Sequence, residues 1–143
     1  MTDAHITGAT VDVGDEGPTL IVEDVSRVDF VKYAGASGDF NPLHVDETCA
    51  TEAGHPSVFA HGMYTAGLAS RMLTDWFGTA NVRRFNVRFT DQVWPDDTLT
   101  VAGEVTDVER SDGEVVVEAE FAVENQDGEV VLSGDATAGL PPE

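Results

Sequence analysis

The feature of this chain that most constrains its fold is the order of its hydrophobic patterns. A helical, glycine-punctuated first half gives way near Gly78 to a second half rich in strand-forming residues. Residues 63–77 contain no proline, and their apolar and small side chains recur at helical spacing: Met63, Ala66, Gly67, Ser70, Leu73 and Phe77. Small residues let another backbone approach closely, so we predict a buried central helix here.

Four segments with strand-like alternation follow this helix: residues 82–93, 98–108, 114–123 and 129–138. Asp-Gly pairs, which are strong hairpin signals, lie between the last three, in Ser111-Asp112-Gly113 and Gln126-Asp127-Gly128. Consecutive hairpins indicate an antiparallel meander, and one helix against its face makes an α+β domain. Because exposed sheet edges need covering, we also expect two subunits to pair edge to edge as a homodimer.

A capping box marks the start of a helix in the first half. Ser26 and Asp29 open an amphipathic segment just after a short β-like run at residues 20–24. Gly35 and Gly38 are expected to end this helix. The helix should therefore deliver the chain to a turn at residues 39–44.

The charge balance disfavours several classes of function. The chain has 27 acidic and 7 basic residues, a formal net charge of -20. Nucleic acid and anionic membrane surfaces are disfavoured as partners, because both require clustered Lys and Arg. Hydrophobic residues make up 41% of the chain, unlike a disordered acidic tail. We therefore predict one folded domain spanning residues 1–143.

The sequence favours a cytoplasmic location. A single cysteine, Cys49, cannot form an intramolecular disulfide, which fits a reducing compartment. Residues 1–10 lack the basic and apolar regions of a signal peptide, and no run of about 18 apolar residues exists.

The acidic surface also resembles that of cytoplasmic proteins from extreme halophiles. Lys32 is the only lysine, and the carboxylates are scattered rather than blocked. Such a surface repels itself at low ionic strength and is screened at high salt. An ordinary acidic protein is the alternative.

The turn at residues 39–44 has the densest group of chemically capable side chains. Pro42 fixes its own φ and biases Asn41 toward extended geometry. A carboxylate at Asp39 and an imidazole at His44, converging on one water, would supply the acid and base that hydration of an activated double bond requires. Alternatively, Asp39 and Asn41 merely cap a turn and His44 is an ordinary side chain.

Gly62 lies where the apolar helix is predicted to begin. The first N–H groups of a helix have no intrahelical partner and attract anionic oxygen. A thioester carbonyl gains negative charge when water adds to a conjugated double bond, so the Gly62 N–H could act as an oxyanion donor. The alternative is a plain helix entry, in which His61 only fills space.

Two motifs in this order resemble the MaoC-like, R-specific enoyl-CoA hydratase family: Gly38-Asp39-Phe40-Asn41-Pro42-Leu43-His44-Val45-Asp46 and Ala60-His61-Gly62-Met63. The resemblance runs from about residue 26 to residue 97, and the later strand pattern is compatible with the family's hot-dog fold. It implies a long central helix wrapped by a curved antiparallel sheet, usually in a homodimer.

The resemblance also implies reversible syn hydration of trans-2-enoyl-CoA to (R)-3-hydroxyacyl-CoA, for polyhydroxyalkanoate or other fatty-acyl metabolism, with no metal or redox cofactor. Asp39 and His44 would act on one water, Asn41 would support that water or the pair, and Gly62 would supply the oxyanion N–H. The two coupled groups would titrate as a unit, so base and acid are not apportioned between them.

The stretch before the helix departs from the family, because Gly54-His55-Pro56-Ser57-Val58-Phe59 replaces a more typical Phe-Gly-x-x-Ile run. The shape of the acyl pocket is therefore open. Phe59 and His61 are candidates for substrate contacts or for core, and Ser57 is a candidate for a hydrogen bond to the catalytic pair or for a surface role.

Arg84 and Arg88 are further candidates, because alternate strand residues share a face and could bind the phosphates of coenzyme A. Surface charge balance is the alternative. No metal site is expected, because no short helical ligand motif joins the residues that could bind one: His44, Asp46, His55 and His61.

Two other functions stay open. A dehydratase could act on a different acyl thioester, such as a branched or dicarboxylic acyl-CoA or an acyl carrier protein. A non-catalytic hot-dog subunit could bind acyl-CoA, although the intact Asp39 and His44 pair favours an enzyme.

We expect the midpoint of thermal unfolding to rise as KCl is added, because counter-ions screen the repulsion between surface carboxylates. Circular dichroism across a KCl series measures this midpoint. A midpoint indifferent to KCl would remove the halophile interpretation.

Overall fold

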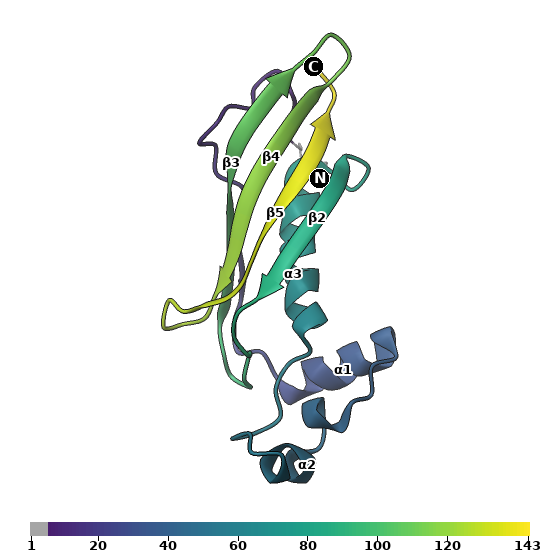
Figure 1. The fold of residues 1–143 in the computed structure, drawn as a ribbon, viewed down its shortest axis with the longest axis vertical. Coiled ribbons are helices and arrows are strands. Elements are labelled where there is room, and N and C mark those ends of the chain that lie inside the picture. Colours follow the sequence, from purple (N-terminus) through teal and green to yellow (C-terminus); the bar gives the residue numbers. More distant parts are fainter. Residues whose placement is uncertain (1–5) are drawn as a thin grey trace.

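The computed structural model describes residues 6–143 and places one long helix along a five-stranded sheet (Figure 1). Residues 1–5, which belong to the N-terminal stretch without signal-peptide features, lie outside the described part. The elements in chain order are β1 (Leu20–Val22), α1 (Arg27–Ser37), a 3-10 helix (Pro42–His44), α2 (Glu47–Glu52), α3 (Gly62–Phe77), β2 (Val82–Phe89), β3 (Leu99–Arg110), β4 (Val115–Glu124) and β5 (Val130–Leu140). None of the helices in residues 6–143 is long and apolar enough to cross a bilayer.

The sheet is antiparallel with strand order β1-β3-β4-β5-β2. The hairpins β3–β4 and β4–β5 are confirmed, with their turns closed by backbone hydrogen bonds from Ser111 to Glu114 and from Asn125 to Glu129. The prediction of a meander was wrong in one respect, because β2 pairs with β5 instead of β3. The connection at residues 90–98 carries no Asp-Gly turn and leads the chain from one edge of the sheet toward the other.

The capping box of α1 is confirmed. The Asp29 N–H donates to Ser26 Oγ at 3.2 Å, and the Ser26 N–H donates to Asp29 Oδ2 at 2.9 Å. Gly38 ends the helix in the left-handed region, at φ 75°. The expectation for Gly35 was wrong, because this residue lies within α1.

One face of α3 packs on the sheet, and the predicted face is correct in part. Ala66, Leu73 and Phe77 are buried as predicted, whereas Met63, Gly67 and Ser70 are not fully buried. Met63 is 56% exposed and Gly67 is also exposed. The larger side chains decide the orientation, because they bury the most apolar surface. The buried α3 residues are Thr65, Ala66, Ala69, Met72, Leu73, Trp76 and Phe77.

Where β5 passes the core, the chain requires a glycine. A Cβ at Gly134 would lie 2.1 Å from the Asn86 carbonyl oxygen and 2.5 Å from the Phe121 ring. That ring stacks on Phe85 of β2, with centroids 5.6 Å apart. The absent side chain thus lets the edge strand close against the core beside α3.

Candidate active site

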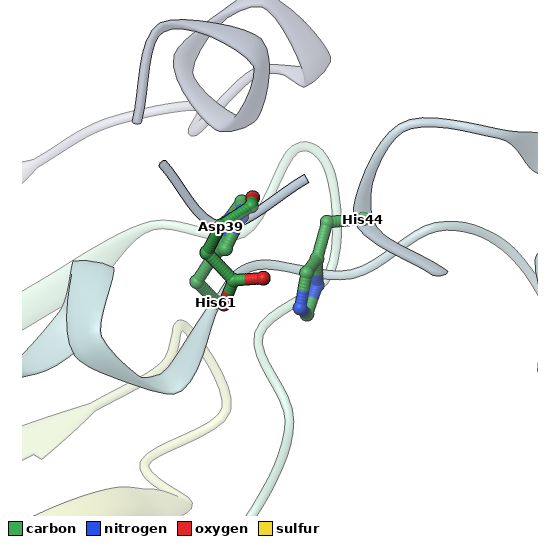
Figure 2. A group of neighbouring side chains, drawn as sticks. All are labelled: Asp39, His44 and His61. Atoms are coloured by element: carbon green, nitrogen blue, oxygen red, sulfur yellow. The ribbon is translucent and has the colours of Figure 1, made fainter. Parts of the chain in front are cut away.

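Three side chains from separate segments meet at the start of α3 (Figure 2). Asp39 follows Gly38, His44 ends the 3-10 helix, and His61 directly precedes α3. One side-chain oxygen or nitrogen from each of the three lies within 4.8 Å of the others. The Asp39 carboxylate points toward the His44 ring in Figure 2. The structure therefore brings the predicted catalytic pair together and adds His61.

Asn41 and Pro42 build the turn that carries His44 to this position. Asn41 Oδ1 accepts a hydrogen bond from the Leu43 N–H at 3.1 Å, and Pro42 is the first residue of the 3-10 helix. The Asn41 N–H donates to Asp39 Oδ1 at 3.3 Å. Asn41 thus caps the turn, the alternative raised by the sequence, and its support of a water stays a prediction.

The orientation of the His44 ring is set by the backbone of Phe59. His44 Nδ1 lies 2.7 Å from the Phe59 carbonyl oxygen. A carbonyl only accepts, so we infer that Nδ1 carries the proton and that Nε2 of the neutral ring carries the lone pair. The Phe59 ring also packs edge-on against the imidazole, with centroids 5.1 Å apart. His44 can therefore accept a proton at Nε2.

The surroundings of His44 favour its neutral form. Burial is the largest influence and lowers the pKa of His44 from its ordinary 6.5, and the neighbouring His61 ring lowers it further. The Phe59 carbonyl and the Asp39 carboxylate oppose this shift, because both stabilise the imidazolium. The net direction is downward, which keeps a base available at neutral pH.

His61 is buried beside this base. Only 2% of its surface is exposed, and its Nε2 lies 2.9 Å from the backbone carbonyl oxygen of Asp39. The ring stacks on that of His44, with centroids 3.9 Å apart and an interplanar angle of 29°. His61 therefore contacts both members of the predicted pair.

Gly62 opens α3 without a capping side chain. The side chain of His61, at the N-cap position, makes no capping hydrogen bond. The Tyr64 N–H donates to the His61 carbonyl at 3.1 Å, which leaves the N–H groups of Gly62 and Met63 without intrahelical partners. A Cβ at Gly62 would lie 3.0 Å from a ring carbon of Phe89. A larger residue would therefore have to displace that ring. This geometry is compatible with an oxyanion donor, which stays a prediction.

The segment before α3 places Phe59 at the site and directs Ser57 elsewhere. Phe59 contacts His44 on one side and Trp94 on another, with the latter centroids 5.8 Å apart. Ser57 Oγ donates to the neighbouring Val58 carbonyl at 2.7 Å. Among the hydrogen bonds of residues 6–143, none joins Ser57 to Asp39 or His44.

Arg84 and Arg88 do share a face of β2, as predicted, but it is the face turned away from α3. They pair in register with Thr137 and Ser133, and they alternate with Phe85 and the other β2 residues that pack toward the core. Within this chain the two guanidinium groups therefore lie across the sheet from Asp39 and His44.

The three clustered side chains are poorly arranged for one metal ion. A metal binds an imidazole along the nitrogen lone pair, in the plane of the ring. Because the rings of His44 and His61 are stacked, with planes only 29° apart, their lone pairs lie in two separate planes, which disfavours a shared ion. His44 Nδ1 and His61 Nε2 are also engaged with backbone carbonyls.

Sequence reasoning missed two aromatic neighbours of the site. Phe89, at the end of β2, lies against Gly62, and Tyr33 of α1 lies 4.9 Å from the His61 ring, centroid to centroid. Strand alternation could have placed Phe89 on the side of Phe85. No local pattern pointed to Tyr33, because the contact joins segments far apart in the chain.

Residues 8–126 match the family model described as MaoC like domain. The chain belongs to this family. It is 43% identical over 65 residues to the peroxisomal hydratase-dehydrogenase-epimerase of Saccharomyces cerevisiae, covering 46% of this chain and 7% of that protein. It is 38% identical over 90 residues to 3-hydroxyacyl-thioester dehydratase Y of Mycobacterium tuberculosis, covering 60% and 31%.

Solved structures of this family share the architecture. R-hydratase PhaJ1 from Pseudomonas aeruginosa matches with a TM-score of 0.85 and 28% identity, over 97% of this chain and 88% of that one. An (R)-hydratase from A. caviae involved in PHA biosynthesis matches with a TM-score of 0.79 and 26% identity, over 92% and 98%. The predicted α+β hot-dog fold is confirmed.

The chain spans only a minor part of the two curated relatives, 7% and 31% of their lengths. Their names include hydratase or dehydratase, which agrees with the hydro-lyase class predicted from the sequence. The activities of those longer proteins are therefore not transferred to this chain by the match alone.

We expect His44 to titrate below pH 6.5 in the folded protein and near 6.5 in the urea-unfolded chain, because burial disfavours the imidazolium. The unfolded chain then binds the proton more readily. The contribution of His44 to the free energy of unfolding is thus present above about pH 6.5 and is lost as the pH falls toward the folded pKa.

Imidazole ¹H–¹⁵N NMR measures both titrations, with His44→Gln to assign the resonance. A folded-state midpoint at or above 6.5 would contradict the buried environment.

Proposed function

We propose that this chain catalyses the reversible hydration of a trans-2-enoyl thioester to the (R)-3-hydroxyacyl thioester. The observation that carries the proposal is the meeting of Asp39 and His44 at the uncapped start of α3. Membership of the MaoC-like family and the R-hydratase neighbours support the reaction and its stereochemistry.

The chemistry begins with a water held between the Asp39 carboxylate and His44 Nε2. The pair removes one proton as the water oxygen bonds to C3, and the π electrons move through C2 to the thioester oxygen. N–H groups at the start of α3 stabilise the negative oxygen. The carbonyl reforms as the pair returns the proton to C2, which gives syn addition from one face.

A homodimer fits the surroundings of the site. Three apolar side chains near it are largely exposed in one chain: Phe40 at 67%, Met63 at 56% and Phe89 at 50%. β2 forms one edge of the sheet, where a second copy can extend it. We expect sedimentation equilibrium to give twice the chain mass, and a monomer would rule the dimer out.

Coenzyme A is our proposed thioester carrier, in fatty-acyl or polyhydroxyalkanoate metabolism of a salt-adapted cell. A chain with net charge -20 repels an acidic carrier protein over a large contact, whereas coenzyme A presents a few phosphates. High salt weakens both repulsions.

Purified protein should consume crotonyl-CoA, followed by the loss of enoyl-thioester absorbance in high salt. Asp39→Asn and His44→Gln should each lower kcat by about 10²- to 10⁴-fold, because each removes a proton-transfer group. Melting curves establish that the variants fold.

Asp107→Asn is the matched control, because it removes an exposed carboxylate from β3 outside the site and should leave kcat unchanged. No turnover of any enoyl thioester by the wild type would favour the non-catalytic binding module. Activity surviving both site substitutions would overturn the mechanism.

A further inference from the structure

His61 has a buried position and a bonding pattern that the acid–base chemistry does not explain. Its Nε2 contacts the Asp39 carbonyl, while its Nδ1 is buried with no hydrogen-bond partner among the described residues. A buried polar atom without a hydrogen-bond partner destabilises the folded state. A phenylalanine would avoid this penalty, but it could not donate a hydrogen bond to the Asp39 carbonyl.

The hydrogen bond identifies which tautomer is present. The Asp39 carbonyl can only accept, so Nε2 of His61 carries a proton. A second proton at Nδ1 would create a buried donor without an acceptor, beside the stacked His44 ring at 3.9 Å. His61 therefore presents a donor to the backbone and has no accessible nitrogen facing a substrate.

This hydrogen bond joins the two segments that carry the site. Asp39 lies in the turn after α1, and His61 directly precedes Gly62 at the start of α3. The bond thus sets the distance between the turn that bears the carboxylate and the backbone that bears the N–H donors. Without it, the exposed Asp39 turn is restrained mainly by short-range hydrogen bonds from Asp39 to Ser37 and from Asn41 to Asp39.

The ring of His61 also limits the movement of His44. One face of His44 stacks on His61, and Phe59 contacts it edge-on. Together with the bond from His44 Nδ1–H to the Phe59 carbonyl, these contacts fix the direction of Nε2. Reacting groups displaced by about 1 Å can lose about 10² in rate.

We propose that His61 is a positioning residue for the hydration reaction: it ties the Asp39 turn to the start of α3 and supports the His44 ring, and it transfers no proton. This inference rests on the proposed function for its kinetic consequence. Its structural part is measurable without turnover.

Imidazole ¹H–¹⁵N NMR of the wild type tests the tautomer directly. The expected spectrum shows His61 protonated at Nε2 and unprotonated at Nδ1. The opposite tautomer would overturn the proposal, whether or not the protein has hydratase activity.

Substitutions of different length and shape distinguish the two contacts of His61, the hydrogen bond to the Asp39 carbonyl and the stacking on His44. In His61→Gln the amide nitrogen reaches about where Nε2 lies, in His61→Asn it falls short, and in His61→Phe the ring remains without a donor. Amide hydrogen exchange of the non-proline residues of the turn 39–44 should accelerate in the Asn and Phe variants and remain closer to wild type in the Gln variant. Equal exchange in all three variants and the wild type would refute the tie.

Kinetics then test the consequence for the reaction. The Asn and Phe variants should lose about 10- to 100-fold in kcat with KM little changed, and the Gln variant should recover part of the loss. Tyr33→Phe is the matched control, because it keeps a ring beside His61 and removes only a hydroxyl. It should retain wild-type kcat.

The pH profile distinguishes positioning from proton transfer. If His61 only positions, the His61→Gln variant keeps every limb of the wild-type profile at a lower plateau. Loss of a limb, or wild-type kcat in the Asn and Phe variants, would overturn the proposal. A wild type without turnover would instead end the proposed function, and the NMR and exchange results would still decide the structural part.

Discussion

The burial of one face of α3 against the sheet is the constraint on which the site depends. The large side chains of this face, including Met72, Leu73 and Trp76, fix the rotation of the helix about its axis. That rotation presents Gly62 beside Phe89 at the end of β2 and turns His61 inward. The first residues of α3 are held in place by the packed core. The Asp39 turn lies outside that core, so separate contacts must hold it against the start of α3.

Local signals in the sequence predicted the elements that local physics dictates. The reciprocal bonds of Ser26 and Asp29 involve residues three apart, and the Asp-Gly hairpins close within a few residues. The turn that carries Asp39 and His44 is also local, because Pro42 and the Asn41 cap set its path. These features needed no knowledge of the rest of the fold.

Apart from the local error at Gly35, the errors concern contacts between distant segments. Alternation in β2 showed which residues share a face, but only the pairing with β5 revealed that Arg84 and Arg88 turn away from α3. Helical spacing on α3 predicted part of the buried face, with Ala66, Leu73 and Phe77, but it missed Met72 and Trp76, which pack against the sheet. The position of His61 was also not predictable from local sequence. Its hydrogen bond to Asp39 and its stacking on His44 depend on how α1, the turn and α3 come together.

Salt screens the charges of the acidic surface more strongly than those of the partly buried site. At 1 M salt the Debye length is about 3 Å, so scattered exposed carboxylates scarcely influence one another or the reaction. Contacts that are partly buried are screened less, and those of His44 with Asp39, Phe59 and His61 belong to this class. The proposed reaction would therefore depend on short, directed interactions and little on the net charge of the surface. A buried imidazole that donates to a backbone carbonyl suits this division, because it holds the carboxylate in place without adding another charge beside it.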